Sequence, residues 1–143
     1  MVMSATGLAV RSRSVTGHLG EVPPPEQLMT VTRNDQDDQP VIVIRGDVDL
    51  STGGRLRDTV SSALQLAGSK PVILDLSAVE FLSSSGLGHL VALDDEARRL
   101  SGSLRIVVDQ TRPVVRPITT MGLDDVLSLF TTVDEALAVP DAP

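Results

Sequence analysis

The sequence contains no cysteine, tryptophan or tyrosine, and it has only two phenylalanines and two histidines among 143 residues. The absence of cysteine excludes disulfides, thiolate nucleophiles and thiolate metal ligands, and it fits a reducing cytoplasm. His18 and His89 are too few to build a metal centre, and no loop has the oxygen-rich pattern that binds a hard cation. We therefore expect no metal and no other cofactor.

Aromatic platforms and an excess of positive charge are missing too. The chain has 12 basic and 19 acidic residues, a formal net charge of −7. Single-stranded nucleic acids and RNA are usually held by aromatic rings beside basic grooves, so we expect no direct contact with nucleic acid. No apolar run approaches the roughly 18 to 20 residues that cross a bilayer, and no signal-peptide core follows Arg11 and Arg13. We expect a cytoplasmic protein that does not bind membranes.

Composition divides the chain into one domain and two ends. Residues 1–27 are rich in small and polar residues and end in the run Pro23-Pro24-Pro25, which favours an extended spacer. We predict a flexible N-terminal extension over residues 1–27, a single domain over 28–139 and a C-terminal tail over 140–143. A peptide that docks a partner is the alternative for the extension.

The domain alternates strand-like and helix-like segments. Apolar and β-branched runs predict strands at 28–33, 41–45, 72–76, 104–108 and 127–130, and Gly46 and Asp47 are expected to end the second of them. Apolar spacing and capping signals predict helices from Ser51 or Thr52 to 67, at 84–100, at 111–121 and at 134–138, the third shortened or kinked by Pro117. Because parallel strands need crossover connections, the fold class is α/β, with a mixed, largely parallel sheet of four to five strands packed with about four helices.

The most informative segment is Asp75–Gly88, DLSAVEFLSSSGLG, in which three serines and a glycine stand at the start of a predicted helix. A serine hydroxyl can accept a hydrogen bond from an unpaired N–H of the first helical turn, so Ser83 or Ser84 is expected to cap the helix. Gly86 is expected to allow close approach of the backbone. A helix N-terminus also favours an anion, so Ser85 is a candidate for a phosphoryl group. Composition alone leaves capping and modification both open.

This segment resembles the signature of STAS-domain anti-anti-sigma factors, in which Asp-Leu-Ser, an apolar pair and Asp-Ser-Ser-Gly-Leu-Gly follow in that order. The segment Gly46–Leu50 resembles the family's Gly-x-x-Asp turn, and Met121–Phe130 resembles its C-terminal segment. The resemblance covers about residues 28–139 and implies a STAS-like fold. It also implies that the phosphoacceptor is the serine directly before the glycine, Ser85, with Ser84 as the less favoured acceptor. Ser83 stands where the family usually has aspartate, so one charge that helps kinase recognition is missing.

The resemblance further implies a function as an anti-sigma factor antagonist. In that family the unphosphorylated protein binds an anti-sigma factor that is also a serine kinase, which frees a sigma factor to direct transcription. Phosphorylation ends the binding, and a serine phosphatase of the metal-dependent type restores it. The implied partner surface consists of Asp47, Asp49, Ser83, Ser84, Gly86, Leu87, His89 and Val91.

Simpler interpretations stay open for several of these residues. Leu87 and Val91 are also consistent with the edge of the core, and His89 with a solvated position. Asp47 and Asp49 are also consistent with charges of a turn and of a first helical turn. The oligomeric state is open between a monomer and a weak dimer.

Two rival functions come from other classes. An acyl-transfer enzyme would use Ser85 as nucleophile and His89 as base, but the Gly-x-Ser-x-Gly elbow and an orienting acid are both missing, so we expect no catalytic residues. A STAS module that is not phosphorylated would instead sense a small ligand, a nucleotide or lipid, or join a stressosome-like scaffold. Phosphorylation with kinase and ATP separates this sensor from the switch.

Overall fold

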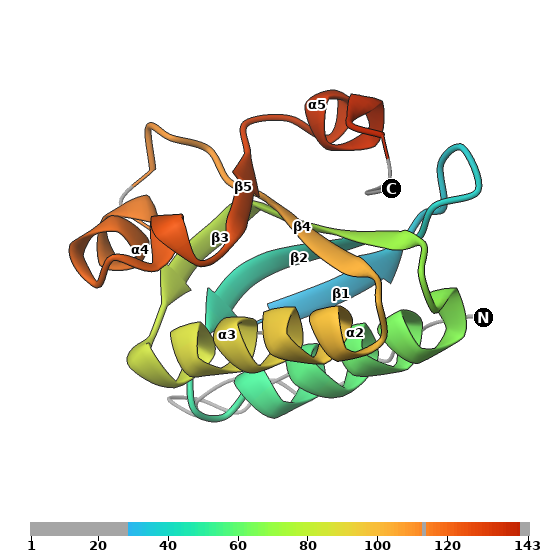
Figure 1. Cartoon of the computed structure of the whole chain (residues 1–143). Coiled ribbons are helices and arrows are strands. Elements are labelled where there is room, and N and C mark those ends of the chain that lie inside the picture. Colours follow the sequence, from blue (N-terminus) through green and yellow to red (C-terminus); the bar gives the residue numbers. More distant parts are fainter. Residues whose placement is uncertain (1–28, 113, 141–143) are drawn as a thin grey trace.

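The sheet of this protein is mixed, as the sequence predicts (Figure 1). The computed structural model describes residues 29–112 and 114–140. Within them, five strands lie in the order β1 (Met29–Arg33), β2 (Val41–Val48), β3 (Pro71–Leu82), β4 (Ser103–Val107) and β5 (Ser128–Phe130). The pair β1 and β2 is antiparallel, whereas β2, β3, β4 and β5 run parallel. The carboxyl ends of these four strands therefore point to the same edge of the sheet.

Helices cover the two faces of the sheet unequally. The long helices α2 (Gly53–Ala67) and α3 (Ser84–Arg99) lie side by side on one face, and the short helix α5 (Val133–Ala138) lies on the other (Figure 1). Between β4 and β5 the chain forms α4 (Val115–Thr120) and the 3-10 turn η1 (Leu123–Asp125). The expected α/β class, strand number and helix number are thus confirmed for the described residues.

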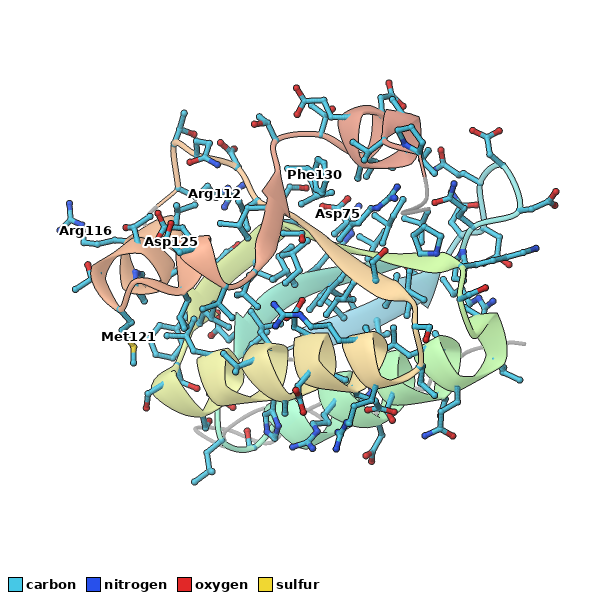
Figure 2. All side chains as sticks on the ribbon, in the orientation of Figure 1. Asp75, Arg112, Arg116, Met121, Asp125 and Phe130 are labelled. Carbon is cyan, nitrogen blue, oxygen red and sulfur yellow. The ribbon has the colours of Figure 1, made fainter. Side chains whose placement is uncertain are left out.

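The hydrophobic core is also divided unequally between the two faces of the sheet. The large cluster lies between the sheet and α2, α3 and α4, and it includes Ile44, Leu74, Leu90 and Ile118, all with no exposed surface. The second cluster, under α5, contains only Val41, Ile73, Val107 and Ala136 as buried members. Figure 2 shows Asp75 and Phe130 on this second face, away from the two long helices. Most of the apolar surface buried on folding therefore lies on the α2 and α3 side.

Two strands are longer than predicted. β2 does not end at Gly46 and Asp47 but continues to Val48, and β3 extends from Pro71 to Leu82. Pairing explains the extension, because Val48 lies opposite Leu82 across two register shifts. Gly46 has a φ of +94°, a conformation that suits such an irregular strand position. Pairing between distant strands, which periodicity does not report, thus sets the strand lengths.

The helix boundaries agree more closely. α3 ends one residue earlier than predicted, and α5 begins one residue earlier. α4 is much shorter than the predicted 111–121, and Pro117 is its third residue, where the missing N–H would have had no helical partner. The turn η1 was not predicted. The predicted N-terminal extension lies outside the described residues.

One buried arginine holds α5 to the sheet. Arg105 of β4 is 4% exposed, and its Nη1 donates to the carbonyls of Ala136 and Val139, each at 2.7 Å. Its Nη2 donates to the carbonyl of Pro140 at 3.1 Å, so the predicted tail begins with a residue that contacts the domain. A guanidinium at the C-terminal end of a helix complements the carbonyls and the dipole there.

Candidate functional site

The serine segment lies where β3 ends and α3 begins. Ser83 has extended backbone angles, and its N–H donates to the carbonyl of Val48 at 2.9 Å, which ties the segment to the end of β2. The Ser83 Oγ accepts a hydrogen bond from the N–H of Gly86 at 3.1 Å. Ser83, and not Ser84, is therefore the N-cap of α3.

Ser85 stands in the first turn of α3 and is half-buried. Its Oγ lies 2.9 Å from the Oγ of Ser83, and either oxygen can be the donor. Within residues 29–112 and 114–140, the N–H groups of Ser84 and Ser85 have no acceptor, and the first turn of α3 has no acidic residue. The positive end of the α3 dipole is thus uncompensated beside a reachable hydroxyl.

Gly86 is required by packing. A Cβ at this position would lie 2.7 Å from Leu82 Cδ1 and 3.0 Å from Val48 Cγ1, closer than atoms tolerate. The predicted close approach of the backbone at Gly86 is therefore what the structure contains. Leu87 is 3% exposed and belongs to the main core, so it offers almost no side-chain surface to a partner. For Leu87 the alternative of a core residue holds, because an apolar side chain on this face gains more from burial.

The turn between β2 and α2 lies against the serine segment and is organised by Asp49. Its Oδ1 accepts hydrogen bonds from the N–H of Ser51 at 2.9 Å, the Oγ of Ser51 at 2.8 Å and the N–H of Thr52 at 3.2 Å. The bond from the Ser51 hydroxyl is the main cause that lowers the pKa of the Asp49 carboxyl, against an opposing effect of desolvation. Thr52 is the N-cap residue of α2, one of the two residues predicted for this position, but its side chain makes no capping hydrogen bond to a helical N–H.

The other predicted surface residues are partly buried. Asp47 is half-buried, and its carbonyl accepts a hydrogen bond from Thr52 Oγ1 at 2.8 Å. The ring of His89 lies against Gly53, where a Cβ would meet the His89 Cδ2 at 2.7 Å. His89 is therefore half-buried and packs its ring against the start of α2. Val91 is half-buried on the same helix.

One feature of α3 that was not predicted is an ion pair between a buried aspartate and an exposed arginine. Asp94 has a side-chain exposure of 7%, and an oxygen of its carboxylate lies 2.7 Å from Nη2 of Arg98. The same nitrogen donates to the carbonyl of Val126 at 2.9 Å, which ties α3 to the segment after η1. Burial raises the pKa of the Asp94 carboxyl, the charge of Arg98 opposes the rise, and Asp95 adds to it. The spacing of four residues between acid and base was the available signal.

Possible sites for other ligands are limited. A shallow hollow of about 530 Å³ is lined by Gln110, Thr111, Arg112, Val115, Arg116 and Thr119. Figure 2 shows Arg116 pointing away from the body of the protein at α4. No residue of the serine segment lines this hollow. The part of the chain that the structure describes contains no cluster of three or more side chains suited to hold a metal ion.

Among the described residues, none forms a helix with the length and apolar character needed to cross a bilayer.

Comparison with known proteins assigns the class of this chain. The family model of the STAS domain matches residues 29–136, and the chain therefore belongs to the STAS domain family. The family and fold expected from the sequence are both confirmed.

Individual relatives are named as anti-sigma factor antagonists. The chain is 36% identical over 112 residues to the anti-sigma-F factor antagonist RsfB of Mycobacterium tuberculosis, covering 76% of this chain and 87% of RsfB. A crystal structure of an anti-sigma factor antagonist from Mycobacterium paratuberculosis matches with a TM-score of 0.68 and 31% identity over 76% of this chain and 91% of that one. The unphosphorylated form of the antagonist SpoIIAA matches with a TM-score of 0.61 over 76% of this chain and 93% of its own, but at 21% identity this likeness concerns the fold alone.

Proposed function

We propose that this protein is an anti-sigma factor antagonist that binds an anti-sigma factor through the surface around Ser85 and is switched off when Ser85 is phosphorylated. The observation that carries the proposal is the half-buried Ser85 in the first turn of α3, beside the N–H groups of Ser84 and Ser85, which have no acceptor among the described residues. Relatives of the same family that carry the name of anti-sigma factor antagonists support the partner class. The protein acts by binding and has no catalytic chemistry of its own.

The phosphate would act mainly by charge. It adds about −1.5 to −2 charges at neutral pH. One such charge at roughly 5 Å from a carboxylate of the partner changes the interaction by about 3 kcal/mol at an effective dielectric constant near 20. Since about 1.4 kcal/mol corresponds to a tenfold change in affinity, half of this repulsion is enough to release the partner. The switch therefore needs no large conformational change.

The surface of the proposed switch comprises residues that the structure leaves at least partly exposed around Ser85. They are Asp47, Asp49, Ser83, Ser84, His89 and Val91. The partner is proposed to be an anti-sigma factor with serine kinase activity, and a metal-dependent serine phosphatase is proposed to reverse the modification. Both reactions then take place on a protein of the cytoplasm.

Binding to the anti-sigma factor tests the proposal. The partner is recovered by pull-down from the source lysate with the wild-type chain, and its affinity is then measured by calorimetry for wild type, Ser85→Ala and Ser85→Asp. We expect Ser85→Ala to bind like wild type and Ser85→Asp to bind about tenfold or more weakly, a loss of about 1.4 kcal/mol. The exposed neighbour supplies the matched pair Ser84→Ala and Ser84→Asp, which we expect to have smaller effects.

Mass spectrometry after incubation with the partner and ATP completes the test. We expect addition of one phosphate to wild type and to Ser84→Ala, and none to Ser85→Ala. Tight binding of Ser85→Asp would contradict the switch. No phosphate on the wild type, together with a thermal shift caused by a nucleotide or lipid, would favour the sensor instead.

A further inference from the structure

The hydroxyls of Ser83 and Ser85 form a pair whose hydrogen bonds can be counted. A serine hydroxyl has one proton to donate and two lone pairs that accept. One lone pair of Ser83 Oγ is used by the N–H of Gly86 at 3.1 Å. The proton and the second lone pair remain for the contact of 2.9 Å with Ser85 Oγ. Ser83 can therefore either donate to Ser85 or accept from it without losing the cap of α3.

Phosphorylation of Ser85 leaves Ser83 only as the donor in this contact, because Ser85 loses its hydroxyl proton. Transfer from ATP forms the bond between Ser85 Oγ and phosphorus, breaks the bond between the γ-phosphorus and its bridging oxygen to release ADP, and sends the hydroxyl proton to solvent. In the dianionic form that prevails at neutral pH, the side chain of phosphorylated Ser85 has no proton to donate. The Ser83 proton becomes the only one left in the pair, and the nearest new acceptors are the phosphate oxygens.

The importance of a donor at Ser83 for a phosphate on Ser85 depends on the other polar groups around the two serines. The N–H groups of Ser84 and Ser85 lack acceptors within the described residues and lie at the positive end of α3. On the opposing side, the Ser83 N–H bonds to Val48, whose chain neighbours Asp47 and Asp49 bring two carboxylates to the adjacent turn. His89 is one turn further along α3. A phosphate on Ser85 would therefore find its hydrogen-bond donors at the start of its own helix.

We propose that Ser83 is a positioning residue for phosphorylated Ser85: its oxygen keeps the hydrogen bond from the Gly86 N–H while its proton is donated to the phosphate. This inference rests on the proposed function, because it presupposes that Ser85 is phosphorylated. It assigns to Ser83 two tasks at once, the cap of α3 and the retention of the phosphate on the helix terminus. A carboxylate at position 83 could cap but would repel the phosphate at about the same short distance.

The test needs no kinase. Phosphoserine is encoded at position 85 during translation of the full chain, and the second pKa of the phosphate is followed by ³¹P NMR. We expect this pKa to be lower in the protein than in an unstructured phosphoserine peptide, because hydrogen-bond donors favour the dianion. In the Ser83→Ala background we expect the pKa to rise by about half a unit to one unit, which corresponds to a 3- to 10-fold change in the acid dissociation constant. Ser83→Asp should raise it by about one unit or more through like-charge repulsion.

Two variants control for indirect effects. Ser83→Thr keeps a hydroxyl and a cap and should titrate like the Ser83 protein, whereas Ser84→Ala removes the exposed neighbouring hydroxyl and should also change nothing. Equal titration of the Ser83, Ser83→Ala and Ser83→Asp proteins would overturn the inference. If Ser83→Ala does not fold, the comparison of Ser83→Thr with Ser83→Asp decides in the same way. The binding and phosphorylation experiments above are independent of this result, so failure of the positioning role and failure of the switch remain distinguishable.

Discussion

Among the described residues, α3 and α5 both start with a hydroxyl cap, but acidic residues follow the cap in α5 and not in α3. At α5, Thr132 Oγ1 accepts from the N–H of Glu135 at 3.1 Å, and Glu135 Oε1 accepts from the N–H of Thr131 at 3.0 Å and of Thr132 at 3.3 Å. Asp134 and Glu135 also place acid in the first turn. At α3, Ser83 caps in the same way, but no acid follows.

The third residue of each helix makes the difference. Glu135 completes a capping box in α5, whereas Gly86 has the equivalent position in α3. An acid at position 86 would force Leu82 and Val48 to move, because their side chains lie 2.7 Å and 3.0 Å from the position of an added Cβ. The packing that holds α3 on the sheet therefore also keeps its N-terminus uncompensated. The proposed site for a phosphoryl group thus depends on the packing at Gly86 as well as on the cap.

The attachment of the two helices differs as well. α3 buries six residues, whereas α5 buries only Ala136 and is held by polar contacts at both ends. We predict that Arg105→Met, which removes the contacts to the α5 carbonyls, lowers the free energy of unfolding by about 3 kcal/mol. The exposed Arg116 is the matched control, and Arg116→Met should stay within about 0.5 kcal/mol. Urea unfolding measures both, and equal stabilities would contradict the role of Arg105.

Substitutions at two glycines of α3, Gly86 and Gly88, distinguish the effect of packing on stability from the effect of helix propensity. Gly86→Ala should lower the free energy of unfolding by about 1–3 kcal/mol, because the added methyl group overlaps Leu82 and Val48. Gly88 has nothing within 4 Å of its Cβ position, so Gly88→Ala should raise stability by about 0.5–1 kcal/mol. Chemical denaturation of the two variants side by side gives the comparison. The same sign for both substitutions would mean that Gly86 is not a packing residue.

Removing each cap tests whether the two helix starts are equivalent in stability. Ser83→Ala and Thr132→Ala should each lower the free energy of unfolding by about 1 kcal/mol. The first turn of α3 has no acidic residue, and one can be introduced at the exposed Ser84. Ser84→Asp should raise the free energy of unfolding by about 0.3–1 kcal/mol, because a negative charge there is favoured by the positive end of the helix dipole. Ser84→Asn controls for side-chain size. A gain from Ser84→Asp that does not shrink at high salt would contradict the electrostatic explanation.

Two carboxylates, Asp49 in the turn before α2 and Asp94 on α3, should respond to acid in opposite directions. The pKa of Asp49 is lowered in the folded state, so its contribution is present above the unfolded value and is lost as the pH falls toward the folded pKa. The pKa of Asp94 is raised by burial, so its protonation in the folded state adds stability as the pH falls. We predict that Asp49→Asn makes the acid loss of stability shallower and that Asp94→Asn makes it steeper. Urea unfolding between about pH 3 and 7 measures the slopes, and parallel slopes would contradict both assignments.

Local signals in the sequence were sufficient for much of the architecture. The apolar spacing of α2 and α3 identified buried residues such as Leu56, Val60, Leu90 and Leu93, because one face of a helix must meet the sheet. Boundaries that depend on a distant partner were missed, as at Val48 and Leu82. The capping function of the Ser83–Ser84 pair was predicted, but the choice between them required the backbone geometry.

The sequence by itself determined the order of strands and helices, the family, and the presence of hydroxyls before a glycine at one helix start. These features depend on residues close together in the chain, where spacing and capping rules apply directly. Only the tertiary structure decided that Leu87 is core, that His89 lies against Gly53 and that Arg105 holds α5. Each of these depends on which distant segment covers a given residue, and the spacing of residues along the chain does not identify that segment.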